Sequence, residues 1–389
     1  MFKIQTLNKI AAIGLDRLPR DNYETASELS SPDAILVRSA DMLQMAFQDN
    51  LLAIGRAGAG VNNIPVDKCT SQGIVVFNTP GANANAVKEL AILSLLIGSR
   101  RVIPGIEFVK TLKGKGAEFT NLVEKNKGQF TGPEIMGKKL GVMGLGAIGV
   151  MVANSAVALG MEVEGHDPFI SVEHAWNLSH EVKKAKGLDR LIATSDYITL
   201  HVPQTEQTKG FINAEKIARM KKGVRIINMS RGGLIVEKDV IEALKNGQIG
   251  AYITDFASDA LLDAPNTICL PHLGASTPEA EDNCAVMVAD QVKDFMENGN
   301  ILNSVNFPNT SIERQGDARI TIVNRNVPNM VGQFSTVLAD AKLNILEMIN
   351  KSRGEVAYNL VDVTGTVTPE IVAKLKKIDG VIKVRVLEK

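Results

Sequence analysis

The stretch that begins at Leu140 and ends at Asp167 constrains the fold of this 389-residue chain more than any other part of the sequence. A short apolar run leads into three spaced glycines, a segment with helical character follows, and a second apolar run ends in an aspartate. A strand, a glycine-rich turn and a helix in that order predict a βαβ unit of a parallel sheet. The rest of the chain must then supply the other layers of an α/β domain.

Each glycine of this turn has its own physical role. Gly144 permits the tight turn, Gly146 lets the backbone approach a pyrophosphate, and Gly149 lets the helix pack close to the strand. A pyrophosphate would bind the first amides of the helix, where the helix dipole favours negative charge. Asp167 would accept hydrogen bonds from the adenosine ribose and repel a 2′-phosphate, so the pattern predicts NAD rather than NADP. The alternative is a glycine-containing turn that binds nothing.

The composition favours small molecules as binding partners. Lys plus Arg and Asp plus Glu both total 43, so no excess charge points to nucleic acid or to an anionic membrane. The sequence has no secretory leader and no apolar run of ~18 residues, so we expect no membrane span and a cytoplasmic protein. The three cysteines have no metal-ligand spacing, and we expect no metal.

Apolar runs alternate with helical patterns as far as residue 296, which predicts an α/β fold with two doubly wound, Rossmann-like parallel sheets. The segment 105–139 is rich in Lys and Gly and reads as irregular surface. We expect further strands at 34–37, 51–54, 74–77, 197–201, 225–229, 251–255 and 267–270, with helices at 84–100, 214–220, 238–245 and 278–296.

The C-terminal part has a different pattern. Residues 297–317 are polar and read as a linker. The order βαββαβ follows, which is typical of a small ferredoxin-like domain. We expect its strands at 320–323, 345–349, 356–363 and 381–387 and its helices at 331–340 and 369–376.

Residues that follow the strands are the candidates for chemistry, because ligands bind at the carboxyl ends of a doubly wound sheet. His272 is the best placed of five histidines to take a proton from an alcohol during hydride transfer. Arg231 lies before two glycines and suits a carboxylate held by two parallel hydrogen bonds. A carboxylate would orient His272, and Asp255, Asp259 and Asp263 all compete for this role. Otherwise these side chains are structural or surface residues.

Several motifs in the right order make the chain resemble the D-isomer-specific 2-hydroxyacid dehydrogenases with a C-terminal ACT domain, over essentially its whole length. Beside the glycine turn, these motifs are Val-Arg-Ser-Ala at 37–40, Gly-Arg-Ala-Gly-Ala-Gly-Val-Asn-Asn at 55–63, Asn-Thr-Pro-Gly at 78–81, Asn-Met-Ser-Arg-Gly-Gly at 228–233 and Pro-His-Leu-Gly-Ala-Ser-Thr at 271–277. The resemblance implies a substrate-binding domain of residues 1–98 and 280–308, an NAD-binding domain of residues 99–279 and an ACT regulatory domain of residues 318–389.

The resemblance also implies catalytic roles. His272 would be the acid/base and Arg231 would bind the substrate carboxylate. The family usually has a catalytic glutamate three residues after a phenylalanine, and counting from Phe256 places Asp259 there, one methylene shorter. The implied cofactor contacts are Gly144, Gly146, Ala147, Ile148, Gly149, Asp167, Val202, Pro203, Met229, Ser230, Arg231, Asp255, His272, Gly274 and Ala275.

A phosphorylated substrate needs further cations, and the resemblance implies Arg38, Arg56 and Lys127, with Ser39 and Gly58 beside them. Each cation is otherwise an exposed charge. The implied reaction is NAD-dependent oxidation of 3-phospho-D-glycerate to 3-phosphohydroxypyruvate, the first step of L-serine biosynthesis. Two alternatives stay open: a reductase of glyoxylate, hydroxypyruvate or another 2-keto acid, and a non-catalytic NAD-sensing regulator on the same scaffold.

ACT domains of this family pair edge to edge and hold L-serine between subunits, so the resemblance implies a serine effector and a homodimer or homotetramer. Asn324 and Asn326 match the first ligand loop, and Asn344 starts the next strand. Asn329 stands where the family often has glycine, and asparagine tolerates the positive φ that the turn needs. The alternative is a dimerisation module without an effector site.

Overall fold

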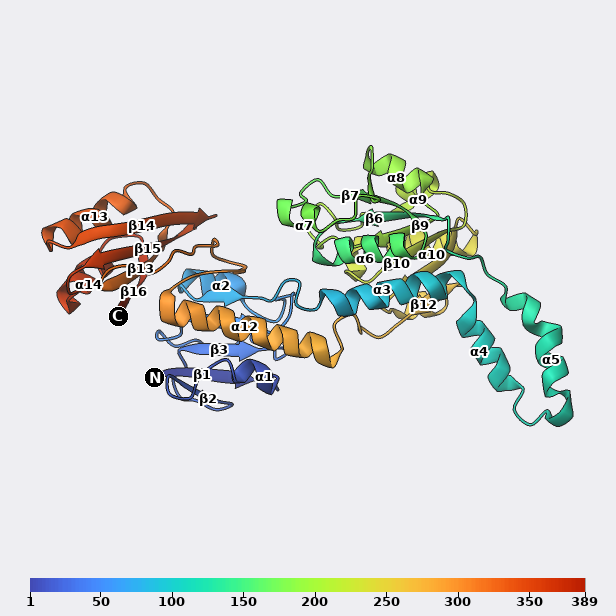
Figure 1. Ribbon diagram of the computed structural model, residues 1–389, viewed down its shortest axis with the longest axis horizontal. Coiled ribbons are helices and arrows are strands. Elements are labelled where there is room, and N and C mark those ends of the chain that lie inside the picture. The colour runs from blue at the N-terminus through green and yellow to red at the C-terminus, as the bar shows by residue number, and fades with distance from the viewer. Residues whose placement is uncertain (389) are drawn as a thin grey trace. The chain divides into compact units, whose positions relative to one another are not determined.

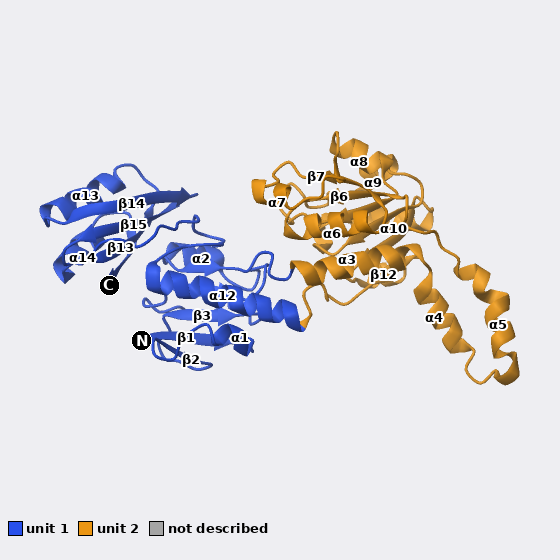
Figure 2. Cartoon of the chain, viewed as in Figure 1, with its two compact units in different colours: residues 1–83, 278–389 blue, residues 84–277 orange. Residues whose placement is uncertain are grey.

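A computed structural model describes residues 1–388 of the chain. These residues form two compact units, one of residues 1–83 and 278–388 (unit 1) and one of residues 84–277 (unit 2), coloured separately in Figure 2. Two parallel sheets and one small antiparallel sheet confirm the predicted fold class. No helix within the described residues is both long and apolar enough to cross a membrane.

Unit 2 is built on a seven-stranded parallel sheet in the order β12-β11-β10-β9-β6-β7-β8. The strand order reverses between β6 and β9, and a doubly wound sheet binds its ligand at the carboxyl ends of the strands at such a point. The strands are β6 (Lys139–Met143), β7 (Glu162–His166), β8 (Lys183–Lys184), β9 (Tyr197–Leu200), β10 (Val224–Asn228), β11 (Ile249–Thr254) and β12 (Thr267–Cys269).

Helices cover both faces of this sheet, which is why its strands read as continuous apolar runs. In β10, Ile226 packs in the cluster with α9 and α10, and Ile227 packs in the cluster with α3 and α6. The structure therefore places α3 in unit 2, whereas the sequence-based boundary after residue 98 had assigned it to the first domain. The helices are α3 (Ala84–Ser99), α6 (Ala147–Ala158), α7 (Val172–Trp176), α8 (Leu188–Thr194), α9 (Ala214–Arg219), α10 (Glu237–Lys245) and α11 (Asp259–Leu262).

The prediction of irregular chain at 105–139 is wrong. This part of unit 2 forms a helical arm of α4 (Val102–Thr111) and α5 (Phe119–Asn126), with 3-10 turns η1 (Gly116–Glu118) and η2 (Lys127–Phe130). Figure 1 shows the arm reaching away from the sheet of unit 2. No residue of α4 or α5 is buried, so these helices have no core of their own to mark them in the sequence.

The first lobe of unit 1 has a five-stranded parallel sheet in the order β2-β1-β3-β4-β5. The sequence predicted the last three strands but not β1 and β2. The elements are β1 (Phe2–Leu7), α1 (Ala12–Leu15), β2 (Tyr23–Ala26), β3 (Ala34–Val37), β4 (Ala53–Arg56), α2 (Val66–Ser71), β5 (Val75–Phe77) and α12 (Pro278–Asn298). Helix α12 returns from far along the chain to pack on this sheet, where Val288 joins the same apolar cluster as Ile4 and Leu36.

The small domain of unit 1 has the predicted order βαββαβ, with an antiparallel sheet in the order β14-β15-β13-β16. Ile320 and Ile322 of β13 pack with Phe334 of α13 and Leu375 of α14, so both helices cover one face of the sheet. Asn329 precedes α13 with φ of 67°, as the sequence allowed. The elements are β13 (Ala318–Arg325), α13 (Met330–Asp340), β14 (Asn344–Arg353), β15 (Val356–Thr364), α14 (Pro369–Lys376) and β16 (Val381–Glu388).

Candidate functional site

The glycine-rich turn joins β6 to α6 at the point where the sheet order of unit 2 reverses. Gly144 has φ of +90°, and a Cβ there would overlap the carbonyl of His201. A Cβ on Gly149 would overlap the carbonyl of Gly144. Gly146 is different, because a Cβ there would meet no atom within 4 Å. The fold itself requires two of the glycines, and the third leaves open space at the start of α6, where a pyrophosphate can approach the helix amides.

Asp167 follows β7, and its carboxylate is fixed beside this turn. Oδ2 accepts a hydrogen bond from Leu145 N at 2.8 Å, and Oδ1 accepts one from Phe169 N at 2.8 Å. These bonds hold the carboxylate where the sequence predicted a ribose partner. A ribose hydroxyl would find an acceptor there, whereas a 2′-phosphate would meet a like charge.

A second turn follows β10 and presents Arg231. The buried Asn228 shapes it, because Oδ1 accepts from Ser230 N at 3.2 Å and from Arg231 N at 3.3 Å. Ser230 Oγ donates to Val202 O at 2.7 Å, which ties this turn to the one after β9. Arg231 is exposed, and Nη1 donates to Ser230 O at 2.6 Å. A guanidinium has five N–H donors, so Arg231 has others to offer a carboxylate.

Asp255 follows β11 and is 2% exposed. Oδ2 accepts from Gly274 N at 3.2 Å, but Oδ1 is buried without a hydrogen-bond partner in the described chain. Burial raises the pKa of this carboxyl group, against the opposing effect of the nearby His272 and Arg231. An unsatisfied buried acceptor costs about 1–3 kcal/mol. Oδ1 therefore points to a donor from outside the chain, and the carboxamide of a nicotinamide has such a donor.

His272 lies in an exposed turn after β12, and its ring centroid is 4.8 Å from that of Phe256. Asp259, the predicted partner, is the exposed first residue of α11, and the structure gives its side chain no hydrogen bond or ion pair with any described residue. Asp255 Oδ2 accepts a hydrogen bond from Gly274 N, two residues after His272. The side chains of Asp255 and His272 also interact electrostatically. The role of Asp259 stays a prediction, and Asp255 is a second candidate to orient His272.

His201 is a residue that the sequence reasoning did not single out as functional. It follows β9 beside the glycine turn, and Nε2 lies 2.9 Å from Thr199 Oγ1. Burial lowers the pKa of His201 to about 4, so the ring is neutral at pH 7. Its position after a strand was a signal, but nothing in the sequence distinguished a half-buried neutral histidine from a catalytic one.

Unit 1 brings two of the predicted substrate cations together. Arg38 follows β3, and Arg56 ends β4 in register with Val37. Arg56 Nε donates to Arg38 O at 3.1 Å, and Arg38 Nη1 pairs with Glu281 Oε1 of α12 at 2.6 Å. Beside them, Gly58 has φ of +152°, and a Cβ there would overlap the Arg56 guanidinium, so the glycine leaves room for this side chain. Two arginines at the carboxyl ends of neighbouring strands favour an anionic ligand.

The remaining predicted substrate and effector residues lie in different surroundings. Lys127 lies on the arm of unit 2, not at a strand end, and pairs with Glu124 one helical turn earlier. In the small domain Asn326 and Asn344 are exposed. Asn324 is 1% exposed, and its amide is bonded to Asn359 Nδ2 and to Arg325 O, so its side chain shapes the loop from within. Ser39 N is bonded to Asn8 Oδ1 at 3.1 Å.

Comparison with known proteins identifies similar chains. Residues 95–274 match the family described as D-isomer specific 2-hydroxyacid dehydrogenase, NAD binding domain. The D-3-phosphoglycerate dehydrogenase of Methanocaldococcus jannaschii is 35% identical over 376 residues, which cover 92% of this chain and 68% of that protein. The enzyme of the same name from Haemophilus influenzae is 32% identical over 361 residues, which cover 90% and 84%.

The matched lengths differ among relatives. The chain spans 59% of the Bacillus subtilis D-3-phosphoglycerate dehydrogenase, to which it is 35% identical. Among solved structures, NAD+-bound 3-phosphoglycerate dehydrogenase from Entamoeba histolytica is 27% identical with a TM-score of 0.60, and the match covers 78% of this chain and 98% of that one.

Proposed function

The chain belongs to the D-isomer specific 2-hydroxyacid dehydrogenases, and from this membership we propose that it oxidises 3-phospho-D-glycerate to 3-phosphohydroxypyruvate with NAD. The observation that carries the choice of substrate is the pair of arginines, Arg38 and Arg56, at neighbouring strand ends of unit 1. A phosphorylated hydroxy acid needs this second cationic region in addition to the arginine that binds its carboxylate.

The residues of unit 2 fit NAD and the chemistry of a dehydrogenase. When bound, NAD supplies the acceptor for the hydride. Arg231 would hold the substrate carboxylate through parallel N–H donors. His272 would take the hydroxyl proton, and the negative charge of Asp255 would stabilise the imidazolium that forms. Phe256 packs against the imidazole and restricts its orientation.

The substrate phosphate would be bound by Arg38 and Arg56. Arg38 is paired with Glu281 at 2.6 Å, and its side chain is 35% exposed. A phosphate bound at these strand ends would either share the Arg38 guanidinium with Glu281 or displace Glu281 from it. Removing Arg38 removes a cation for the phosphate. It should therefore weaken the binding of a phosphorylated substrate and leave unphosphorylated hydroxy acids unaffected.

The direct test is turnover by the purified chain of 3-phosphoglycerate with NAD and of 3-phosphohydroxypyruvate with NADH. Arg38→Met should lower kcat/KM about ten- to hundredfold for these substrates, since a charge-assisted hydrogen bond contributes roughly 1.5–3 kcal/mol. Arg17→Met is the matched control, because Arg17 also forms an ion pair with α12, at Asp290, but not beside Arg56.

The outcomes separate the alternatives. Turnover of glyoxylate or hydroxypyruvate without turnover of the phosphorylated pair would make the chain a reductase of another 2-keto acid. Binding of NAD without turnover of any hydroxy acid would make it a sensor. Equal losses in Arg38→Met for phosphorylated and unphosphorylated substrates would contradict the role of Arg38.

We infer further that the small domain is an ACT domain that binds L-serine and thereby regulates the enzyme. The support is its βαββαβ order and the exposed amides of Asn326 and Asn344, since amide groups can pair with both the ammonium and the carboxylate of an amino acid. Calorimetry should detect serine binding, and the initial rate should fall as serine is added. A rate that is constant up to millimolar serine would leave the domain a purely structural role.

We also propose that the chain forms a homo-oligomer. The arm of unit 2 exposes Val102, Ile106 and Val109 of α4 by 48%, 48% and 42%, and Phe119 of α5 by 38%. An exposed apolar stripe on helices that bury nothing within their own chain is typical of a subunit interface. A second copy of the chain is the partner we propose.

A further inference from the structure

The small domain has a second sheet face that its own helices do not cover. Residues that alternate with the buried Ile320 and Ile322 point to this face. A Cβ on Gly299, which follows α12, would lie 2.7 Å from Thr321 Cγ2, 3.3 Å from Leu360 Cδ2 and 3.4 Å from Leu387 Cδ1. The sheet of the small domain therefore packs directly against the C-terminal end of α12.

This contact provides hydrogen-bond donors for the end of the helix. The last four carbonyls of an α-helix have no partner within the helix and carry its negative dipole end. Arginines of the small domain and of the segment before it reach all four. The bonds are Arg385 Nη1 to Phe295 O at 3.0 Å, Arg385 Nη2 to Met296 O, Arg314 Nη1 to Glu297 O at 3.5 Å and Arg319 Nη1 to Asn298 O at 2.8 Å. Tyr358 OH also donates to Gly299 O at 2.6 Å.

Arg319 fixes the orientation of this contact. Its guanidinium and the carboxylate of Asp362 are both fully buried, and Nε and Nη2 reach the two carboxylate oxygens at 2.6 and 2.7 Å. Nη1 also donates to Ile312 O, and Nη2 to Glu313 O. A buried bidentate pair with every donor satisfied tolerates few other geometries, so it restricts how the small domain can hold the end of α12.

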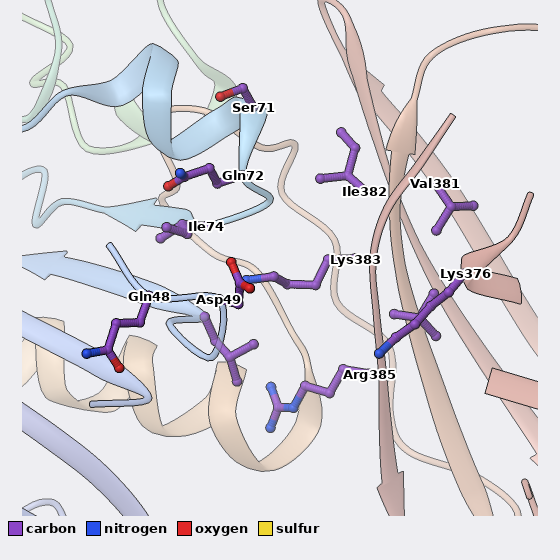
Figure 3. Close-up of a pocket in the computed structure, with 12 residues that line it drawn as sticks. Gln48, Asp49, Ser71, Gln72, Ile74, Lys376, Val381, Ile382, Lys383 and Arg385 are labelled. Carbon is purple, nitrogen blue, oxygen red and sulfur yellow. The ribbon is translucent and has the colours of Figure 1, made fainter. Parts of the chain in front are cut away.

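Arg385 is the residue that reaches the helix from β16. Its guanidinium lies 5.8 Å from the ring centroid of Phe2 and 5.6 Å from that of Phe295, and burial lowers its pKa. Figure 3 shows Lys383 and Arg385 extending from β16 along a cavity of about 560 Å³ between the small domain and the first lobe. The packing is open on this side, whereas Tyr358 and Leu360 join the apolar cluster of the first lobe, so apolar packing and polar bonds together hold the contact.

The other end of α12 carries the partner of Arg38. Glu281, in the first turn of the helix, forms the ion pair at 2.6 Å. Between the two ends one face of α12 packs closely on the first lobe, since a Cβ on Gly14 would lie 2.5 Å from the Ala285 carbonyl carbon and one on Gly55 would lie 2.5 Å from Val288 Cγ2. Because close-packed interiors transmit strain, these contacts offer a route from the C-terminal end of α12 to Glu281.

We propose that the small domain is the C-terminal cap of α12, and that α12 transmits the position of this domain to Arg38. The capping itself is independent of the reaction. Its use in regulation rests on the proposed function, because it makes the phosphate-binding cation the point at which a small-domain effector acts. Loosening the cap frays the last turn of α12, lets Glu281 shift, and weakens the binding of the phosphorylated substrate.

The test compares two arginines that both hold the small domain to the first lobe. Arg385→Met keeps the apolar stem but removes the donors to α12. Arg353→Met is the matched control, because Arg353 Nη1 donates to Ser304 O at 2.8 Å, outside the helix. Hydrogen exchange of the last turn of α12 should become about tenfold faster in Arg385→Met, which is what losing roughly 1.4 kcal/mol gives, and should not change in Arg353→Met. Arg385→Lys, which keeps the charge with fewer donors, should lie in between.

The second readout follows transmission along the helix. In Arg385→Met, exchange around Glu281 should also become faster, KM for 3-phosphoglycerate should rise at unchanged kcat, and inhibition by serine should weaken while serine still binds. Unchanged exchange in the last turn would overturn the cap, whatever the activity. Faster exchange there with unchanged exchange around Glu281 would overturn the transmission. If the chain has no dehydrogenase activity, the exchange data still decide both points, so a failure of the proposed function remains distinct. If Arg385→Met does not fold, Arg385→Lys gives the same comparison.

Discussion

Asp255 has one oxygen bonded to Gly274 N and the other buried without a partner. This arrangement serves two purposes. The bonded oxygen holds the turn that carries His272, and the unpaired oxygen is available to a donor of the cofactor. The negative charge of the carboxylate also acts on His272, whereas Asp259 is exposed and unpaired among the described residues. In the proposed reaction, a single carboxylate would hold both the cofactor and the proposed base, His272, in place.

This interpretation predicts different effects of two isosteric substitutions. Asp255→Asn should lower kcat/KM by about a hundredfold or more, because it removes the charge that stabilises the imidazolium. Asp259→Asn should change it by no more than a few-fold. Steady-state kinetics of both variants across pH 6 to 9 would check this. A large loss in Asp259→Asn and a small loss in Asp255→Asn would instead support Asp259 as the residue that orients His272.

His201 predicts how stability depends on pH. Its pKa is 6.5 in the unfolded chain and about 4 in the folded protein, so the unfolded state binds the extra proton between these values. The stability contributed by the neutral ring is complete above pH 6.5 and is lost as the pH falls towards 4. His201→Gln cannot bind that proton. Between pH 7 and 4.5 the parent should lose about 2–3 kcal/mol more of its free energy of unfolding than the variant, measured by urea denaturation. Equal losses would contradict this explanation.

At the scale of elements, the sequence predicted the helices and strands that pack in an apolar core better than those on the surface. Strands β9 to β12 of unit 2 were predicted to within two residues, because strands covered on both faces are apolar runs, whereas β8, two exposed lysines, was not predicted. The arm was missed although α4 has an apolar stripe at helical spacing, because the Lys- and Gly-rich segment around it suggested irregular surface and neither helix buries a residue. β1 was missed because it is mostly half-buried. At the site, the Arg38–Glu281 pair joins residues far apart in the chain, and no local pattern marks such a contact.

Substitutions in the glycine turn should separate effects on the stability of the fold from effects on NAD binding. Gly149→Ala should lower the free energy of unfolding by roughly 1–3 kcal/mol, because its Cβ overlaps the carbonyl of Gly144. Gly146→Ala should change stability by less than about 0.5 kcal/mol, because its Cβ meets nothing in the chain. It should nevertheless weaken NAD binding about tenfold or more, since the methyl group occupies the space for the pyrophosphate. Urea denaturation and calorimetric NAD titration would measure both. Normal NAD affinity in Gly146→Ala would place the pyrophosphate elsewhere.

At the scale of the whole molecule, the exposed arm predicts assembly. The parent should sediment at a multiple of the 41.9 kDa chain mass. Ile106→Glu places a charge in the apolar stripe of α4 and should shift the sedimentation velocity towards that of the single chain, at unchanged helix content. Trp176→Glu is the control, since Trp176 of α7 is 84% exposed outside the arm. If both variants sediment like the parent, the arm is not the interface.

The division of unit 1 into two separate stretches of chain affects how the protein is synthesised. The apolar cluster of the first lobe contains Ile4 and Leu36 from the first stretch and Val288 and Val292 from α12. The ribosome makes the sheet first and must add roughly 200 residues, at about 5–20 per second, before the covering helix exists, a delay on the order of 10–40 s. During this delay unit 2, which is continuous, can fold, while the apolar face of the nascent first lobe remains accessible to chaperones.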